Sequence, residues 1–201
     1  PTRFTFQFQN KVNIKSVEIE NIFNRKFQNI NKFKAIAFKP TIHNYVIVNT
    51  KENTQTLSGK NVYTKDKIFN TNVKIEPGTK ILLDDNVSLI FKKNVIFDGT
   101  ENNPITISQN NMNNPWGTVA IVGPDSKGSI INNTNFNGGS GDKIKNYKFV
   151  SMLSIHNTEN IKLNKINLKK NYIYDDMLHI VYTKNIKIYN SKFSNTYADA
   201  I

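Results

Sequence analysis

Three aspartates and a histidine near the end of the chain have the types and spacing of an acid–base site. Asp175 and Asp176 precede one short apolar stretch that contains His179, and Asp199 precedes another. Two carboxylates about 5 Å apart can share a proton, bind calcium or act as an acid–base pair. An aspartate at the start of a strand also caps turns, and a lone exposed histidine is typical of an ordinary surface. We favour these structural interpretations, because no catalytic arginine or lysine motif accompanies the four residues.

Aromatic residues are the second set of candidates, because the face of an aromatic ring suits the C–H-rich face of a sugar. Tyr182 and Tyr189 alternate with apolar neighbours in a way that predicts outward side chains. Trp116 is a third candidate, although we favour a place in the core for its indole. All three residues are therefore predicted ligand contacts, and Tyr182 and Tyr189 are favoured over Trp116.

Residue types that are missing exclude several kinds of chemistry. The chain has no cysteine and only three histidines, which lie far apart in the sequence. Disulfides, thiolate zinc sites and cysteine nucleophiles are thereby excluded, and no metal-binding motif is present. We expect no metal and no cofactor; calcium is expected only if the chain is an enzyme.

The charge points to an anionic partner only in a general way. The formal net charge is +12, which would suit nucleic acid or an anionic polysaccharide. However, asparagine, lysine and isoleucine make up roughly four residues in ten, a composition that AT-rich codons favour. Arginine, the usual residue for bidentate contacts to nucleic acid, occurs only at Arg3 and Arg25. We therefore do not expect nucleic-acid binding.

The sequence pattern that predicts secondary structure differs before and after residue 70. Residues 1–70 mix short alternating strands with one amphipathic stretch, and they predict a small β-rich N-terminal cap or subdomain. Residues 71–201 consist of apolar strands of three to five residues separated by polar turns. No apolar stretch approaches the length of a membrane helix.

The second region repeats itself. Met152–Asn171 aligns with Met177–Thr196 at a shift of 25 residues, and Asn160 then falls on Asn185. Asp199-Ala200-Ile201 matches the start of the previous unit at Asp176. A period of this length is typical of a solenoid, and asparagine suits its tight turns and stacked ladders.

Strand length decides which solenoid is predicted. Each unit holds two or three very short strands and no amphipathic helix, which fits an all-β fold, the right-handed parallel β-helix. About 130 residues at roughly 25 per coil give about five coils. Strand-like residues continue to Ile201, so we expect a truncated end that further chain or another subunit covers.

Three landmarks occur in the order known from one superfamily. Ile75-Glu76-Pro77-Gly78-Thr79, Phe97-Asp98-Gly99-Thr100 and Pro115-Trp116-Gly117-Thr118 resemble successive coils of pectate-lyase-like right-handed parallel β-helix proteins. With the repeats, the resemblance covers residues 72–201. The whole chain also faintly resembles the β-helical part of spore coat protein H-like proteins, although no kinase motif is present. The resemblance implies a fold that serves lyases, hydrolases, adhesins and tailspikes alike.

Two classes of function follow from these observations. The first is a non-catalytic surface or stalk module that binds glycans or protein partners, outside the cell or at its surface and without membrane insertion. The second is a polysaccharide lyase or glycoside hydrolase that acts on an acidic polysaccharide through Asp176, His179 and Asp199. We favour the first class, because the charged residues do not form a clustered site.

Overall fold

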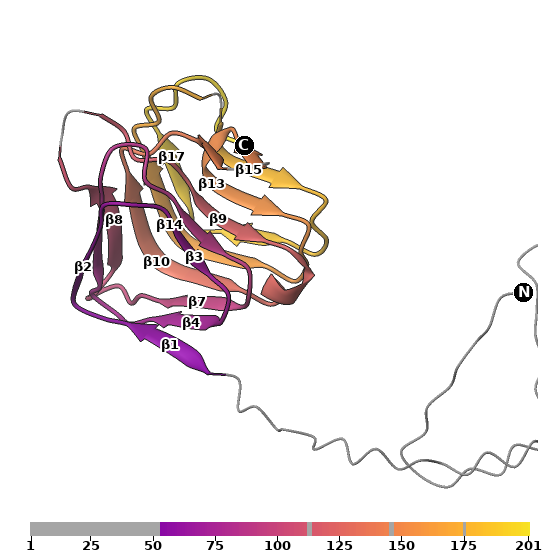
Figure 1. Ribbon diagram of the computed structural model, residues 1–201. Helices are drawn as coiled ribbons and strands as arrows, with labels where there is room; N and C mark the ends of the chain where they lie inside the picture. Colours follow the sequence, from indigo (N-terminus) through magenta and orange to yellow (C-terminus); the bar gives the residue numbers. More distant parts are fainter. Residues whose placement is uncertain (1–52, 112–113, 145–146, 175) are drawn as a thin grey trace, which may run out of the picture. The chain divides into compact units, whose positions relative to one another are not determined.

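The computed structural model describes residues 53–201, except 112–113, 145–146 and 175 (Figure 1). These residues belong to one compact unit, Val48–Ile201. Apart from the single 3-10 turn η1 (Pro124–Ser126), the regular elements of this part of the chain are β-strands. No helix in the described ranges is long and apolar enough to cross a membrane.

The first nine strands form three parallel series, and within each series a strand pairs with the strand three places further along the chain. β1 (Thr54–Leu57), β4 (Asn72–Ile75) and β7 (Val95–Asp98) form one parallel series. β2 (Lys60–Tyr63), β5 (Lys80–Leu83) and β8 (Ile105–Gln109) form a second. β3 (Lys67–Phe69), β6 (Leu89–Phe91) and β9 (Val119–Val122) form a third. Three strands therefore make one repeat.

Later repeats join the first two series into one sheet. β10 (Ile130–Asn137) pairs with β7 through its first half and with β8 through its second. β14 (Lys162–Lys169) pairs with β10 along its whole length, and β16 (Lys187–Tyr189) and β17 (Lys192–Ser194) pair with β14. We call this ten-stranded sheet sheet A.

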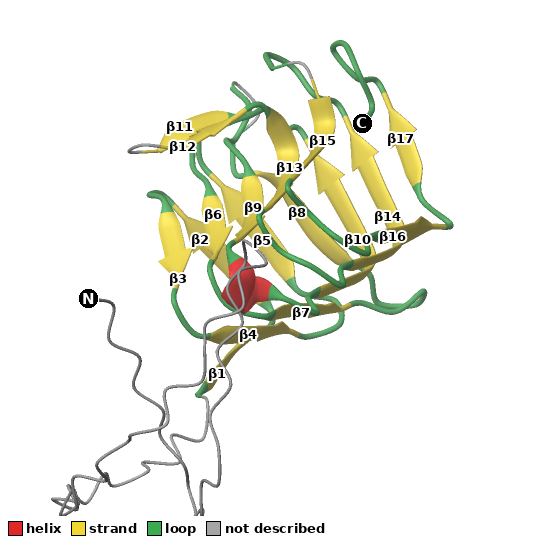
Figure 2. Cartoon of the chain, turned by 90° about the vertical axis from the view of Figure 1, so that its right-hand side faces the viewer, coloured by secondary structure: helices red, strands yellow, loops and turns green. Residues whose placement is uncertain are grey.

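The third series continues as a separate sheet of five strands. β13 (Ser151–His156) pairs with β9, and β15 (Asp176–Val181) pairs with β13 (Figure 2). We call it sheet B. β11 (Asp142–Ile144) and β12 (Tyr147–Phe149) form an antiparallel hairpin between β10 and β13. The expectation of an all-β chain built from short parallel strands is confirmed.

The sheets begin earlier in the chain than residue 71, because β1 to β3 belong to them. The predicted N-terminal cap over residues 1–70 therefore overlaps these sheets from residue 54 onward. Its remaining residues, 1–52, lie outside the described part of the chain.

Alternating side chains from the two sheets fill one apolar core. Ile75, Ile81 and Phe97 are fully buried in it, and removing each such side chain from water contributes about 1.5–3 kcal/mol. The rings of Phe69 and Phe91 stack with centroids 4.7 Å apart in successive repeats. Like residues thus lie on like residues, as stacked parallel repeats require.

The 25-residue shift in the sequence is the register of the last repeats. Leu153 pairs with Leu178 and Leu163 pairs with Ile188. The amides of Met177 and Leu178 donate to the carbonyl oxygens of Asp199 and Ala200, each at 3.2 Å, so the final residues stack on β15 with a slightly shorter spacing. The repeat read from the sequence is thus confirmed as a structural repeat.

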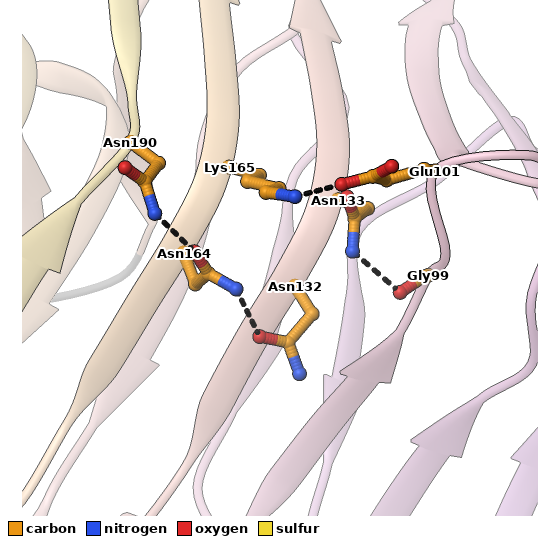
Figure 3. Close-up of polar contacts among 7 residues, drawn as sticks. All are labelled: Gly99, Glu101, Asn132, Asn133, Asn164, Lys165 and Asn190. Carbon is orange, nitrogen blue, oxygen red and sulfur yellow. Dashed lines mark hydrogen bonds and ion pairs between the residues drawn. The ribbon is translucent and has the colours of Figure 1, made fainter.

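Asparagine makes many of the corners. Asn160 and Asn185 have φ of 59° and 53°, and Asn185 Nδ2 donates to Asn160 Oδ1 at 3.1 Å. A second ladder links Asn190 Nδ2 to Asn164 Oδ1 and Asn164 Nδ2 to Asn132 Oδ1, each at 3.4 Å (Figure 3). Both predicted uses of asparagine, left-handed turns and stacked ladders, are confirmed.

Candidate functional site

Part of the outer face of sheet B is apolar, although the outer face of a sheet normally meets water. Leu89 and Phe91 point into the main core, whereas Ile90 between them belongs to a second, smaller cluster. The residues in register with Ile90 are Ile68 and Ala120, which also belong to that cluster. A buried cluster on this face means that another part of the chain covers it.

The β11–β12 hairpin provides that cover. Ile144 and Phe149 from the hairpin complete the cluster, and Phe149 is fully buried. Asp142 at the start of the hairpin accepts a hydrogen bond of 2.7 Å from the hydroxyl of Ser88. The hairpin is therefore held against sheet B by both apolar contact and a polar anchor.

A hollow of about 420 Å³ lies at one edge of sheet B. Its lining includes residues that follow β3, β6 and β9 or end β13, because the carboxyl ends of parallel strands meet at the same edge of a sheet. The polar lining residues are Asn70, Lys92, Lys93, Asp125, His156 and Asn157. Amide, ammonium, carboxylate and imidazole groups thus converge on one concave surface.

The charges of the hollow are unequal. Lys93 Nζ forms an ion pair with Asp125 Oδ2 at 2.8 Å, and both side chains are partly exposed. Lys92 adds a second ammonium group to the same lining. The lining therefore contains two ammonium groups and one carboxylate.

His156 forms part of the wall and is neutral. Burial, with the nearby imidazole of His179 as a second cause, lowers the pKa of His156 from 6.5 to about 4. His156 Nε2 lies 3.1 Å from His179 Nδ1, and its ring packs on Phe149 with centroids 5.5 Å apart. At neutral pH this wall therefore presents an uncharged imidazole.

An exposed aromatic residue lies one repeat away from the hollow. The amide of Asn157, which lines the hollow, donates to the carbonyl oxygen of Val181 at 2.9 Å, and Tyr182 comes next. Asn157 and Tyr182 share a left-handed backbone, with φ of 53° and 50°. Tyr182 is 88% exposed, as the sequence predicts. It does not line the hollow itself, but it lies one repeat from Asn157, which does.

The other predicted aromatic contacts lie elsewhere. Tyr189 is exposed but belongs to β16 in sheet A. Trp116 is fully buried, and its Nε1 donates to the carbonyl oxygen of Asn137 at 2.8 Å. The indole is a core group, and its faces are not available to a sugar. Trp116 as a ligand contact is therefore wrong, and the favoured interpretation, a place in the core, is confirmed.

The predicted acid–base residues lie in the last repeats. Asp176 begins β15, and the register places Asp199 next to it in the following repeat. The backbone carbonyl of Asp199 accepts bonds from Met177 N at 3.2 Å and from Thr196 Oγ1 at 2.7 Å. His179 lies on β15 beside His156. Asp175 lies outside the described residues.

These acidic residues do not assemble a recognised metal site. Within the described ranges, no group of three or more histidine and acidic side chains is placed to hold a metal ion. Asp125 is the carboxylate that lines the hollow, and it is paired with Lys93. Asp176 and Asp199 are not among the lining residues.

The sequence did carry a signal for the hollow, although our sequence interpretation missed it. Asn70 follows Phe69, Lys92 follows Phe91, and His156 follows Ile155, so each is the first polar residue after an apolar strand. Aligning the strands of sheet B would have placed the three in one row, with Val122 between Lys92 and His156. Comparison with protein-family models, curated proteins and solved structures finds no significant match to this chain.

Proposed function

We propose that this chain is a right-handed parallel β-helix that binds glycans without chemical turnover. The hollow on sheet B, with Tyr182 one repeat away, is the binding site in this proposal. A pectate-lyase-like fold and a place outside the cell or at its surface belong to the same proposal.

The pairing of every third strand supports the solenoid part of the proposal. A chain that returns to the same sheet after each set of three strands, always in the parallel sense, winds around its core. Strands β10 and β14 each turn a corner within one strand, at the left-handed residues Asn133 and Lys165. Such corners are what a coil of stacked strands requires.

The composition of the hollow carries the glycan part of the proposal. Protein sites for sugars combine planar hydrogen-bonding groups with an aromatic face, because sugars present hydroxyl groups at their edges and C–H bonds on their faces. The planar hydrogen-bonding groups here are the side chains of Asn70, Asn157 and His156. The aromatic face is that of Tyr182. Lys92 and Lys93 favour glycans with acidic groups.

The polysaccharide lyase or glycoside hydrolase is the second candidate. The neighbouring register positions of Asp176 and Asp199 and the presence of His179 on the same strand as Asp176 favour it. An enzyme of this kind would act at the last repeats and not at the hollow, so the two candidates predict different sensitive residues.

A glycan array followed by titration calorimetry tests the proposal. We expect the full chain to bind a subset of glycans, and Lys92→Ala to weaken that binding at least tenfold. Lys187→Ala, an exposed lysine on sheet A, is the matched control and should leave affinity unchanged. Incubation with the bound glycan, with and without calcium, should release no product.

Two results would overturn the proposal. Equal loss of binding in both lysine variants would mean that only overall charge matters. Release of shorter glycans that stops in both Asp176→Ala and Asp199→Ala would instead establish the enzyme.

A further inference from the structure

We propose that His156 and His179 form a binding site for a divalent transition-metal ion such as Cu²⁺ or Zn²⁺. The two imidazoles come from adjacent parallel strands, β13 and β15, and meet through His156 Nε2 and His179 Nδ1 at 3.1 Å. The inference rests on this pair alone and is independent of the proposed glycan function.

The separation of the two nitrogen atoms matches chelation. An ion held by imidazole nitrogen atoms at about 2.0–2.1 Å, with an angle of roughly 100–110° at the ion, places those atoms about 3.1–3.4 Å apart. Two neutral imidazoles at this distance share one proton between them, and an ion would take the place of that proton. The displaced proton moves to the other nitrogen of its own ring, so both rings stay neutral.

The surroundings keep the pair ready for an ion. A metal ligand must be a deprotonated imidazole nitrogen, and the Nε2 atom of His156 already faces a ring nitrogen of the second imidazole. Contact with Phe149 at 5.5 Å between centroids restricts the orientation of the His156 ring. His156 lines the hollow and both histidines are only partly buried, so water can reach the pair and supply the remaining ligands.

The kind of ion follows from the donor set. Two imidazoles suit copper, nickel and zinc, whereas calcium and magnesium prefer oxygen ligands. The general order of affinities predicts tighter binding of Cu²⁺ than of Zn²⁺. With only two protein ligands, exchangeable positions remain open on the ion.

Calorimetric titration of the full metal-free chain with Cu²⁺ and with Zn²⁺, together with the copper EPR spectrum, tests this inference. We expect one ion per chain and a nitrogen splitting from two imidazoles. His156→Gln and His179→Gln should each weaken binding at least tenfold and reduce the splitting to one nitrogen. His43→Gln changes the third histidine of the chain and should leave both readouts unchanged.

Circular dichroism of each variant separates loss of ligand from loss of fold. His179→Gln is the decisive variant, because it keeps the contact between His156 and Phe149. No binding of either ion to the unchanged chain, or undiminished binding in a folded His179→Gln chain, would overturn the proposal. Loss of binding in His43→Gln would also overturn it.

Discussion

The outer faces of the two sheets have opposite characters although both come from the same repeats. On sheet A, successive outward positions are Lys80, Thr106, Asn135, Asn167 and Lys192. On sheet B, the corresponding row is Ile68, Ile90, Ala120, Ser154 and His179. Sheet A presents side chains that suit water, whereas the first three positions of the row on sheet B are apolar and need a cover.

This difference identifies the outer face of sheet B as the region whose residues are not explained by the stacking of repeats alone. The inward positions of both sheets are equally apolar, since the coil must bury them. Among the described residues, only sheet B carries a hairpin on its outer face. Phe149 of that hairpin contacts His156, which lines the hollow and meets His179. The sheet with the hairpin is thus also the sheet with the concave, chemically mixed surface.

Of the changes proposed here, removing the buried ring of the hairpin should lower the stability of the chain the most. We expect Phe149→Ala to lower the free energy of unfolding by about 3 kcal/mol, because truncating a buried phenylalanine leaves a cavity. Urea denaturation of the full chain measures it. Asn135→Ala, on the outer face of sheet A, is the control and should cost less than about 0.5 kcal/mol. Similar losses in both variants would contradict the distinction between the two faces.

Substituting two exposed tyrosines, one near each sheet, tests which of the two faces binds the glycan. Tyr182 lies one repeat from the hollow, and Tyr189 lies on sheet A. We expect Tyr182→Ala to weaken glycan binding about tenfold, which corresponds to about 1.4 kcal/mol, and Tyr189→Ala to have no effect. Titration calorimetry with the best array glycan measures both. A larger loss in Tyr189→Ala would move the site to sheet A.

Acid should weaken the sheet B side through His156. Burial lowers the pKa of this imidazole from 6.5 to about 4, so between these values the unfolded chain binds a proton more readily than the folded chain. The stability that this group provides is complete above pH 6.5 and is lost as the pH falls through 4. Because the imidazole is only half-buried, we expect a loss of about 1 kcal/mol.

His156→Gln serves as the reference for this effect, because carboxylates also titrate in the same range. The unfolding free energy of the unchanged chain should fall by about 1 kcal/mol more than that of the variant between pH 6.5 and 4. Parallel pH profiles for the two chains would contradict the assignment. His179, Lys92, Lys93 and Asp125 remain in place in both chains, so their contributions cancel.

The asparagine ladder on sheet A should have the smallest effect. Asn164 both donates and accepts at 3.4 Å, at the long end of hydrogen-bond distances (Figure 3). We expect Asn164→Ala to cost about 0.5 kcal/mol in thermal unfolding. A cost above about 2 kcal/mol would mean that the ladder, and not the core, holds the repeats in register.

The repeat could be predicted from the sequence because stacking forces like residues onto like residues. Met152 and Met177, or Asn160 and Asn185, are visible as pairs before any coordinates are known. The hairpin could not be predicted in this way, because it departs from the repeat, whereas the polar residues that follow the strands of sheet B lie in the repeat register and were missed. Trp116 illustrates the limit, since only its position in the packed core, at the corner beside Gly139, decides that its ring is buried.

Nuclear magnetic resonance of the isotopically labelled chain during titration with an array-selected glycan tests the central claim most directly. The account predicts that the resonances of Lys92, His156, Asn157 and Tyr182 shift together and saturably, while those of Lys187 and Tyr189 stay in place. Shifts confined to sheet A or to the last repeats around Asp176 and Asp199 would contradict it.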